Sequence, residues 1–289
     1  MATINNQATL TFSSGGSTVE VASNTASVTL QGPLTISKRS LETSYQLDNT
    51  IVYTVEVKNT STASLQNVTV KDDLGTYNIT ATAKVTPLTY VGPAQRFENG
   101  THVGAVTATV DSTKTFVTFS IGTVAAGSTE IILYKVETNN YAKGATGSTI
   151  ISTASVTADG VSTPVTFPYT LTDDNYADVV IEKSMTPDPI VDGGVLSYVF
   201  VLKNYGNAIA SDVVLKDTLS PIPAVQHTYV DGTQRDEHDF STTTGEYLFP
   251  GLTSTYDFAV PAATITQDAT TGVVSIVPGT HIVRVDGII

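Results

Sequence analysis

Residues 51–74, IVYTVEVKNTSTASLQNVTVKDDL, align without a gap to residues 196–219, LSYVFVLKNYGNAIASDVVLKDTL. The matched pairs, all 145 positions apart, are Tyr53/Tyr198, Lys58/Lys203, Asn59/Asn204, Val68/Val213, Lys71/Lys216, Asp72/Asp217 and Leu74/Leu219. In both blocks apolar and polar residues alternate, which is typical of a β-strand with one buried face. A repeat of this length predicts two copies of one structural unit.

The composition also favours strands. Hydrophobic residues make up 40% of the 289 residues, and they are interleaved with many Thr and Ser. Val, Ile and Thr carry β-branched side chains, which fit a pleated sheet better than a helix. No window shows the periodicity of an amphipathic helix. We therefore predict an all-β protein made of two Ig-like antiparallel β-sandwich domains and an N-terminal donor-strand hairpin.

The two copies are out of phase with the ends of the sequence. Ile36-Ser37-Lys38 and Ile181-Glu182-Lys183 mark the first strand of each copy, and from Lys183 only 107 residues remain of the 145 in a full repeat. The first copy ends with a hairpin around Asp159-Gly160, for which the second copy has no counterpart. A similar hairpin, with a turn at residues 13–17, lies at the N-terminus instead.

This phase shift divides the chain into four expected segments. They are a donor segment at residues 1–31, a first β-sandwich at 32–172, a linker at 173–180 and a second β-sandwich, lacking its last strands, at 181–289. A sandwich without its last strands exposes core residues and unpaired backbone groups along a sheet edge. We therefore expect the second domain to be an association site.

The N-terminal hairpin is the segment expected to fill this site by strand addition. The expected donor residues are Asn6, Ala8, Leu10, Phe12, Val19, Val21 and Val28, and the expected acceptor edge is Ile282, Val283 and Val285. Insertion into the next molecule would join copies of the chain head to tail into a filament. Two alternatives stay open: residues 1–31 could be a separate leader, or the hairpin could fold back into its own second domain.

The charge and the residue types exclude several classes of function. Acidic residues outnumber basic ones by 27 to 14, and the formal net charge of −13 disfavours nucleic acid and anionic lipid as partners. The absence of cysteine excludes disulfides and thiolate metal sites. No apolar run is long enough for a membrane span. The N-terminus lacks the features of a secretory signal, so we expect either another export route or a signal that has been removed.

The repeated blocks have the form Tyr-x-Val-x-Val-x-Asn followed by Val-x-Val-x-Asp-x-Leu, with a leading Lys and a trailing Thr-Ala-Ser-Val-Thr. This pattern resembles the bacterial conserved-repeat domain called domain of unknown function 11. The resemblance implies Ig-like domains in tandem on bacterial surfaces, and hence an extracellular location. A pilus or a fibre on the endospore of a Gram-positive bacterium is one such setting. A Leu-Pro-x-Thr-Gly sorting motif does not occur near the C-terminus.

The same resemblance implies a candidate isopeptide bond. Lys38 and Lys183 would be the amines, and Asp72 and Asp217 the acids that promote the reaction. Burial disfavours an ammonium ion, so a neutral Lys amine can attack an amide carbon. Our spacing places Asn6 where the first domain has Ser152, which cannot form the bond. An Asn6–Lys183 bond would therefore join two molecules.

No catalytic machinery is apparent, and we expect neither an enzyme nor a cofactor. Two acidic segments contain possible metal ligands: Asp231–Asp239, with a His among its carboxylates, could ligate Ca²⁺ or Zn²⁺, and Asp173–Asp178 could ligate Ca²⁺. Neither segment has a recognisable metal-site spacing. We expect no metal. The alternative to a filament subunit is an adhesin or glycan-binding module of a bacterial surface protein, whose ligand the sequence does not define.

Overall fold

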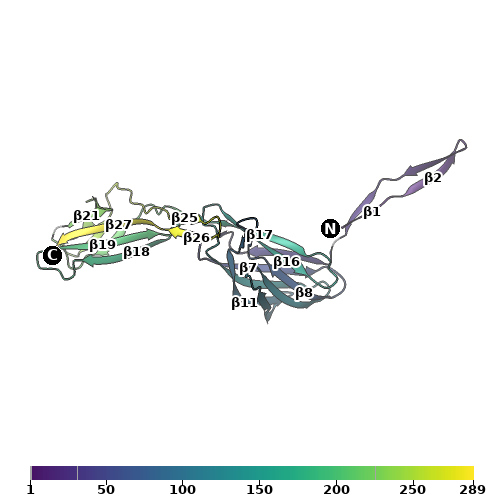
Figure 1. Ribbon diagram of the computed structural model, residues 1–289, viewed down its shortest axis with the longest axis horizontal. Helices are drawn as coiled ribbons and strands as arrows, with labels where there is room; N and C mark the ends of the chain where they lie inside the picture. The colour runs from purple at the N-terminus through teal and green to yellow at the C-terminus, as the bar shows by residue number, and fades with distance from the viewer. Residues whose placement is uncertain (1, 31, 225) are drawn as a thin grey trace.

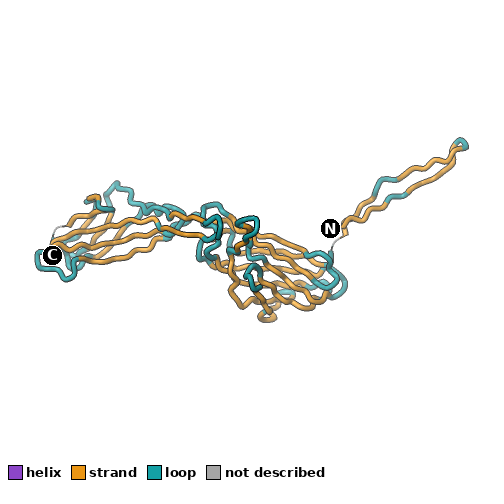
Figure 2. Tube along the Cα trace, in the orientation of Figure 1, coloured by secondary structure: helices purple, strands orange, loops and turns teal. Residues whose placement is uncertain are grey.

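The protein is all-β, as predicted. The computed structural model describes residues 2–30, 32–224 and 226–289, and within these residues every regular element is a strand (Figure 2). Three bodies follow one another along the long axis of the molecule: an N-terminal hairpin, domain 1 and domain 2 (Figure 1). None of the described segments is a helix long and apolar enough to cross a bilayer.

The N-terminal hairpin projects away from domain 1, on the side opposite to domain 2 (Figure 1). Its strands are β1 (Ala2–Asn6), β2 (Thr9–Ser14), β3 (Ser17–Ala22) and β4 (Ala26–Leu30). β1 pairs with β4 and β2 with β3, both antiparallel. Gly15 and Gly16 close the turn with positive φ angles, which glycine adopts without a steric penalty.

Domain 1 is a sandwich of two sheets. The first has the order β12-β11-β15-β7-β5 and the second β13-β14-β8-β16-β17-β6. Its strands are β5 (Leu34–Ser40), β6 (Ser44–Tyr45), β7 (Thr50–Asn59), β8 (Leu65–Asp72), β9 (Tyr77–Asn78), β10 (Lys84–Val85), β11 (Leu88–Glu98), β12 (Thr101–Ala105), β13 (Thr107–Val110), β14 (Val117–Val124), β15 (Thr129–Thr138), β16 (Thr149–Thr157) and β17 (Val165–Asp173).

Domain 2 repeats the first sheet in full and the second in part. Its sheets have the orders β18-β19-β27-β21-β22 and β20-β24-β23, and β25 pairs with β26 outside them. The strands are β18 (Val179–Thr186), β19 (Val195–Asn204), β20 (Leu215–Thr218), β21 (Gln226–Val230), β22 (Thr233–Gln234), β23 (Asp239–Phe240), β24 (Glu246–Phe249), β25 (Thr264–Gln267), β26 (Val274–Val277) and β27 (Gly279–Ile288).

The repeated sequence blocks form the same structure in both domains. β7 and β19 alternate between buried and partly exposed positions, as the period of two requires. Each strand ends at a buried Asn whose amide donates to the backbone: Asn59 to Ala63 O at 2.8 Å and Asn204 to Ala208 O at 2.7 Å. The Asn side chain thus stabilises the turn that follows the strand by bonding to a carbonyl oxygen of that turn.

The structure narrows the expected segment boundaries. β17 ends at Asp173 and β18 begins at Val179, so residues 174–178 connect the two domains rather than 173–180. Met1 and Gln31, the limits of the expected donor segment, lie outside the described residues. The two hydrophobic cores are separate, one in each domain. Each domain therefore has its own packing and can be compared strand by strand with the other.

Candidate assembly site

The first strand of each domain has the same sequence position but a different environment. In domain 1, β16 and β17 pack on β5, and Leu34 and Ile36 are 2% and 8% exposed. In domain 2, every position of β18 is exposed. Val179 and Ile181, which occupy the places of Leu34 and Ile36, are 40% and 51% exposed. Among the described residues, nothing takes the place of β16 and β17 over β18.

A second open surface lies on the facing sheet. In domain 1, β8 pairs with β14 on one side and β16 on the other. Its counterpart β20 pairs with β24 alone in the described part of the chain, which leaves one edge without a partner strand. β18 and the free edge of β20 are together called here the open groove. In domain 1 the corresponding strands, β5 and β8, are covered by or paired with the β16–β17 hairpin.

Three polar side chains meet beneath the β16–β17 hairpin of domain 1. Lys38 Nζ lies 2.6 Å from Asp72 Oδ2 and 2.5 Å from Ser152 Oγ, and Ser152 donates to Asp72 Oδ1 at 2.7 Å. Tyr134 OH donates to Asp72 Oδ2 at 2.6 Å. Both charged side chains are fully buried. Burial lowers the pKa of the Lys38 amine, although the Asp72 charge opposes the shift.

The open groove contains two of these three groups. Lys183 Nζ lies 2.5 Å from Asp217 Oδ2, with the side chains 39% and 18% exposed. The position that Ser152 takes in domain 1 is vacant, because no strand pairs with β20 on that side within the described residues. The structure therefore brings the predicted Lys183 and Asp217 together. It does not bring Asn6 to them, since the hairpin lies beyond domain 1 (Figure 1).

The N-terminal hairpin has one apolar and one polar face. Cross-strand partners in an antiparallel pair share a face, and Leu10 lies opposite Val21, Phe12 opposite Val19 and Ile4 opposite Val28. The other face of β2 carries Thr9, Thr11 and Ser13. Except for the half-buried Val19, the side chains described between residues 3 and 28 are exposed. Within residues 2–30, 32–224 and 226–289, this apolar face has no partner.

A β-bulge keeps the apolar residues on one face. Residues 23–25 lie opposite residues 7–8, so the second strand carries one extra residue at that point. Backbone N–H of Ser23 donates to Ala8 O at 2.8 Å, which closes the pairing there. Because side chains alternate along a strand, the extra residue shifts the alternation. Val28 then faces the same side as Val21.

The apolar face of the N-terminal hairpin matches the buried face of the β16–β17 hairpin. The first strand reads Ile4-x-Asn6-x-Ala8-x-Leu10, and β16 reads Ile150-x-Ser152-x-Ala154-x-Val156, with all four side chains of β16 buried. The first strand of the N-terminal hairpin therefore has the same alternating pattern as β16, whose packed position is visible in domain 1. In this register Asn6 takes the place of Ser152.

The expected acceptor edge does not lie at the edge of its sheet. Ile282, Val283 and Val285 lie on β27, which pairs with β19 on one side and β21 on the other. β27 is thus a central strand, and Val283 and Val285 are buried in the core. The prediction was wrong because consecutive strands cross between the sheets: β15 lies in one sheet and β16 in the other. The open surface is on β18 and β20 instead.

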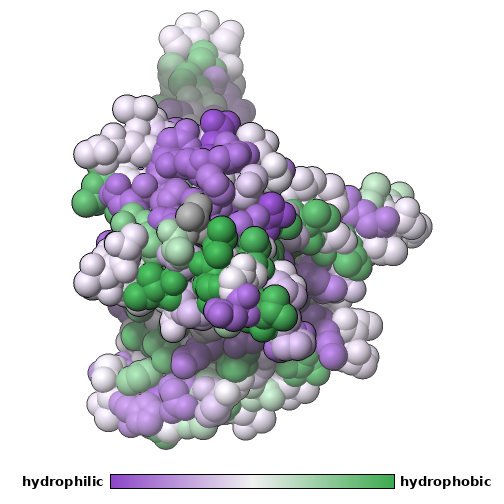
Figure 3. Space-filling view, turned by 90° about the vertical axis from the view of Figure 1, so that its left-hand side faces the viewer, coloured by the Kyte–Doolittle hydropathy of each residue, from purple (hydrophilic) through white to green (hydrophobic). Residues whose placement is uncertain are grey.

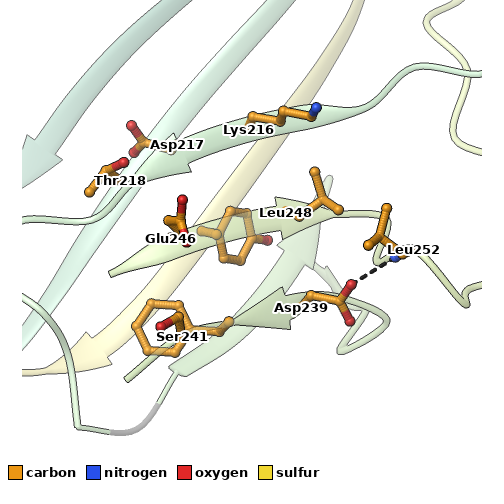
Figure 4. Close-up of a pocket in the computed structure, with 10 residues that line it drawn as sticks. Lys216, Asp217, Thr218, Asp239, Ser241, Glu246, Leu248 and Leu252 are labelled. Carbon is orange, nitrogen blue, oxygen red and sulfur yellow. Dashed lines mark hydrogen bonds between the residues drawn. The ribbon is translucent and has the colours of Figure 1, made fainter. Parts of the chain in front are cut away.

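A solvent-open surface of mixed polarity lies along the free edge of β20 and over β24. Figure 4 shows Lys216, Asp217 and Thr218 on β20, with Glu246 and Leu248 on the neighbouring β24. Asp239 Oδ2 accepts a hydrogen bond from the backbone N–H of Leu252 at 2.8 Å. This surface is open to solvent and lies beside the free edge of β20.

The two acidic segments include strand ends and the connections beside them. In the 231–239 segment, Asp231 contacts His281 and Asp236 contacts His227, so these carboxylates pair with imidazoles rather than with one another. Asp173 accepts a hydrogen bond from Asn207 Nδ2 at 2.8 Å, next to the interdomain linker. Across the described ranges, no three His, Asp or Glu side chains converge as a metal site would require.

Comparisons with known proteins give only distant similarities. No protein-family model matches the chain, and no curated protein is significantly similar to it. The domain-of-unknown-function resemblance thus remains one of short motifs. Among solved structures, the major pilin subunit of Bacillus cereus is 12% identical over 96% of this chain and 73% of that chain, with a TM-score of 0.38.

Two further solved structures are similar at the same low level. The pilus backbone from Streptococcus pneumoniae is 11% identical over 85% of this chain and 55% of that chain, with a TM-score of 0.34. A collagen-binding domain from a Staphylococcus aureus adhesin is 13% identical over 50% of this chain and all of that chain (100%), with a TM-score of 0.31. Similarities of this size say nothing about function.

Proposed function

We propose that this chain is the structural subunit of an extracellular filament on a bacterial cell or spore, such as a pilus or a spore appendage. The N-terminal hairpin of one copy fills the open groove in domain 2 of the next. The observation that carries this proposal is the match between the hairpin and the groove, for which domain 1 is the template within the same chain.

Docking would satisfy both partners. The exposed donor residues Leu10, Phe12 and Val21 would cover Val179 and Ile181 of β18. Fully burying one such side chain contributes about 1.5–3 kcal/mol, against roughly 4–15 kcal/mol lost in association. Docking is favourable when the apolar side chains of the two faces together contribute more than that cost. The first strand of the hairpin would also pair with the free edge of β20.

The geometry makes the contact head to tail. The hairpin and domain 2 lie at opposite ends of the molecule, with domain 1 between them (Figure 1). In domain 1, the β16–β17 hairpin ends where domain 2 begins. A hairpin docked in domain 2 of another subunit would end at the far end of that domain. Domain 1 of the subunit that donates the hairpin would follow there. Such a heterologous contact repeats along a line.

The docked hairpin would also place Asn6 beside Lys183 and Asp217. As a neutral amine, Lys183 Nζ would attack Cγ of Asn6. A new Nζ–Cγ amide bond forms and the Cγ–Nδ2 bond breaks. The amine proton passes through the Asp217 carboxyl to the leaving nitrogen, and ammonia departs. The result is a filament with covalent links between subunits.

Assembly is tested by electron microscopy and sedimentation of the purified full-length protein. The double variant Leu10→Asp/Phe12→Asp places charge on the apolar face and should abolish filaments. The matched control Thr9→Asp/Thr11→Asp places the same charge on the polar face and should assemble normally. Filaments from the first variant would overturn the proposal, as would monomeric wild-type protein at every concentration.

A peptide of residues 2–30 separates the filament from the adhesin alternative. If the groove accepts this hairpin, the peptide should raise the melting temperature of domain 2 in the Leu10→Asp/Phe12→Asp protein, because a ligand of the native state stabilises it. A peptide that leaves the melting temperature unchanged would contradict hairpin docking. A glycan or surface ligand that raises it instead would favour the adhesin.

The covalent link has its own readout. Wild-type filaments boiled in detergent should give a ladder of oligomers, each link having lost one ammonia by mass spectrometry. Asn6→Ala filaments should assemble and then separate into monomers. Ser152→Asn should create an internal bond with Lys38 in domain 1. If boiled wild-type filaments give monomers alone, with no loss of ammonia, the covalent link is refuted. The docking of the hairpin is not affected by that result.

A further inference from the structure

We propose that the β25–β26 hairpin is a clamp that fixes the angle between the two domains of one subunit, and that the junction between successive subunits lacks this clamp and bends. The first half concerns the single chain. The second half rests on the proposed head-to-tail assembly.

The clamp reaches from domain 2 to the end of domain 1. β25 and β26 lie in the connection between β24 and β27 and belong to neither sheet of domain 2. Gln267 Nε2 donates to Tyr77 OH at 2.6 Å, and the backbone N–H of Val274 donates to Asn140 O at 2.7 Å. Both acceptors belong to domain 1. The two domains are therefore joined by directional bonds outside the linker.

Apolar contacts between the clamp and domain 1 are tight. A Cβ atom added to Gly144 would lie 2.9 Å from side-chain atoms of Ile265 and Leu47. One added to Gly272 would lie 2.7 Å from Ile79 and 2.9 Å from Val85. Surfaces packed this closely allow little relative movement, because a change of angle separates some atoms and overlaps others.

The linker adds contacts at the same joint. Asn207 Nδ2 donates to Asp174 O at 2.7 Å as well as to Asp173, and the backbone N–H of Leu47 donates to Tyr176 OH at 3.3 Å. Asn207 belongs to domain 2 and Leu47 to domain 1. The linker is thus bound to both domains at the joint that the clamp covers.

Domain 1 has no counterpart of the clamp. Where domain 2 carries β25 and β26, domain 1 connects β14 to β15 by the turn 125–128. Ala125, Ala126 and Gly127 are exposed. Thr62, which occupies the repeat position of Asn207, is exposed too. This end of domain 1 would face the subunit that receives its hairpin, and it offers no hairpin to hold that subunit.

On the other side of the proposed junction between subunits lies the end of domain 2 that is remote from domain 1 of the same chain. Figure 3 looks at this end and shows apolar atoms gathered between polar ones. Val191, Ile222 and Ile288 are exposed there, near the end of β27. Apolar contact is non-directional, so it can hold the two ends together over a range of angles. Each subunit would thus bring one rigid joint and one compliant joint to the filament.

The single-chain half is tested without filaments. In full-length protein carrying Leu10→Asp/Phe12→Asp, spin labels on Thr107→Cys and Thr233→Cys report the distance between domains, since the chain has no other cysteine. We expect a narrow distribution that becomes at least about twofold wider with Ile265→Ser/Gln267→Ala. The matched control Thr264→Ala/Thr266→Ala changes exposed positions of the same strand and should keep the narrow distribution. An unchanged width in the clamp variant would overturn the clamp.

The filament half is tested by electron cryo-microscopy of filaments without the Leu10 and Phe12 changes. Bending at subunit junctions should exceed bending within subunits, and Ile265→Ser/Gln267→Ala should remove this difference. Equal bending at both joints in wild-type filaments would overturn the asymmetry. If no filaments form, head-to-tail assembly fails, and the spin-label distances still decide whether the clamp exists.

Discussion

β5 and β18 are the same strand in two environments. Both run antiparallel to the next strand of their sheet, and both carry an aliphatic-x-aliphatic-x-Lys pattern. β5 is buried by the β16–β17 hairpin, and β18 is bare within the described residues. The difference shows that the burial of this strand depends on the hairpin that covers it. Domain 1 therefore displays, within one chain, how domain 2 would look once it is filled.

Closing domain 2 within its own chain should have the largest effect. In this variant residues 2–30 are moved behind Ile289 through a flexible connection as long as residues 139–148, which join β15 to β16. The groove should fill, filaments should disappear, and domain 2 should gain roughly 5 kcal/mol or more from the buried apolar surface. Urea unfolding and sedimentation measure both effects. The same rearrangement carrying Leu10→Asp/Phe12→Asp is the control. Equal stability of the two proteins would contradict the idea that the N-terminal hairpin fills domain 2 as the β16–β17 hairpin fills domain 1.

The two lysines should respond differently to the same substitution. Lys38→Met leaves Asp72 charged and buried without its partner, which costs about 3–5 kcal/mol. Lys183→Met breaks a solvent-exposed ion pair, which costs about 1 kcal/mol or less. Chemical unfolding of the Leu10→Asp/Phe12→Asp protein, followed by hydrogen exchange to assign each transition, measures the difference. Similar losses in the two domains would show that the open groove is already closed in the free subunit.

The paired isoleucines provide a purely apolar version of this comparison. Ile36→Ala removes a buried side chain and should destabilise domain 1 by about 2–4 kcal/mol. Ile181→Ala should change the free subunit by roughly 0.5 kcal/mol or less, because Ile181 is already half exposed. In filaments, Ile181→Ala should weaken docking and raise the concentration needed for assembly. No effect on that concentration would place the hairpin elsewhere.

The smallest of these differences is expected at Asp173, where the domains meet, between two pH values. Burial raises the pKa of this carboxyl to about 6, so the folded state favours the protonated form. Its contribution to stability is therefore complete below about pH 4, its unfolded value, and is lost as the pH rises through about 6. Asp173→Asn should raise stability by about 1–2 kcal/mol at pH 7.5 and have little effect at pH 4. Thermal melts at both pH values measure this, and a larger gain at the lower pH would contradict the assignment.

Much of the fold follows from local patterns in the sequence. The alternation in residues 51–59 and 196–204 identified β7 and β19, and the constant offset of 145 predicted two equivalent domains. The first inference rests on the period of a strand, which depends on neighbouring residues only, and the second on a repeat within the sequence. The same spacing placed Asn6 at the position of Ser152, whose contact with Lys38 and Asp72 the structure shows.

The acceptor surface could not be predicted from local sequence patterns. Whether a strand such as β27 lies at an edge depends on long-range pairing, which leaves little trace in its own sequence. A signal was nevertheless present: Val179 and Ile181 lie 145 positions after Leu34 and Ile36, so the covered strand of domain 1 pointed to the uncovered strand of domain 2. The β25–β26 clamp left no such signal, because it has no counterpart in the first copy.

The placement of hairpin and groove at opposite ends of the molecule has a consequence for growth. In the proposed filament, every subunit that docks its hairpin would bring an empty groove of its own, so each addition would recreate the site that it occupied (Figure 1). No feature in the described part of the subunit limits the number of subunits or blocks the groove at the end of the filament. The length of a filament built in this way is therefore set from outside, by the supply of subunits or by a terminal partner that offers a hairpin but no groove.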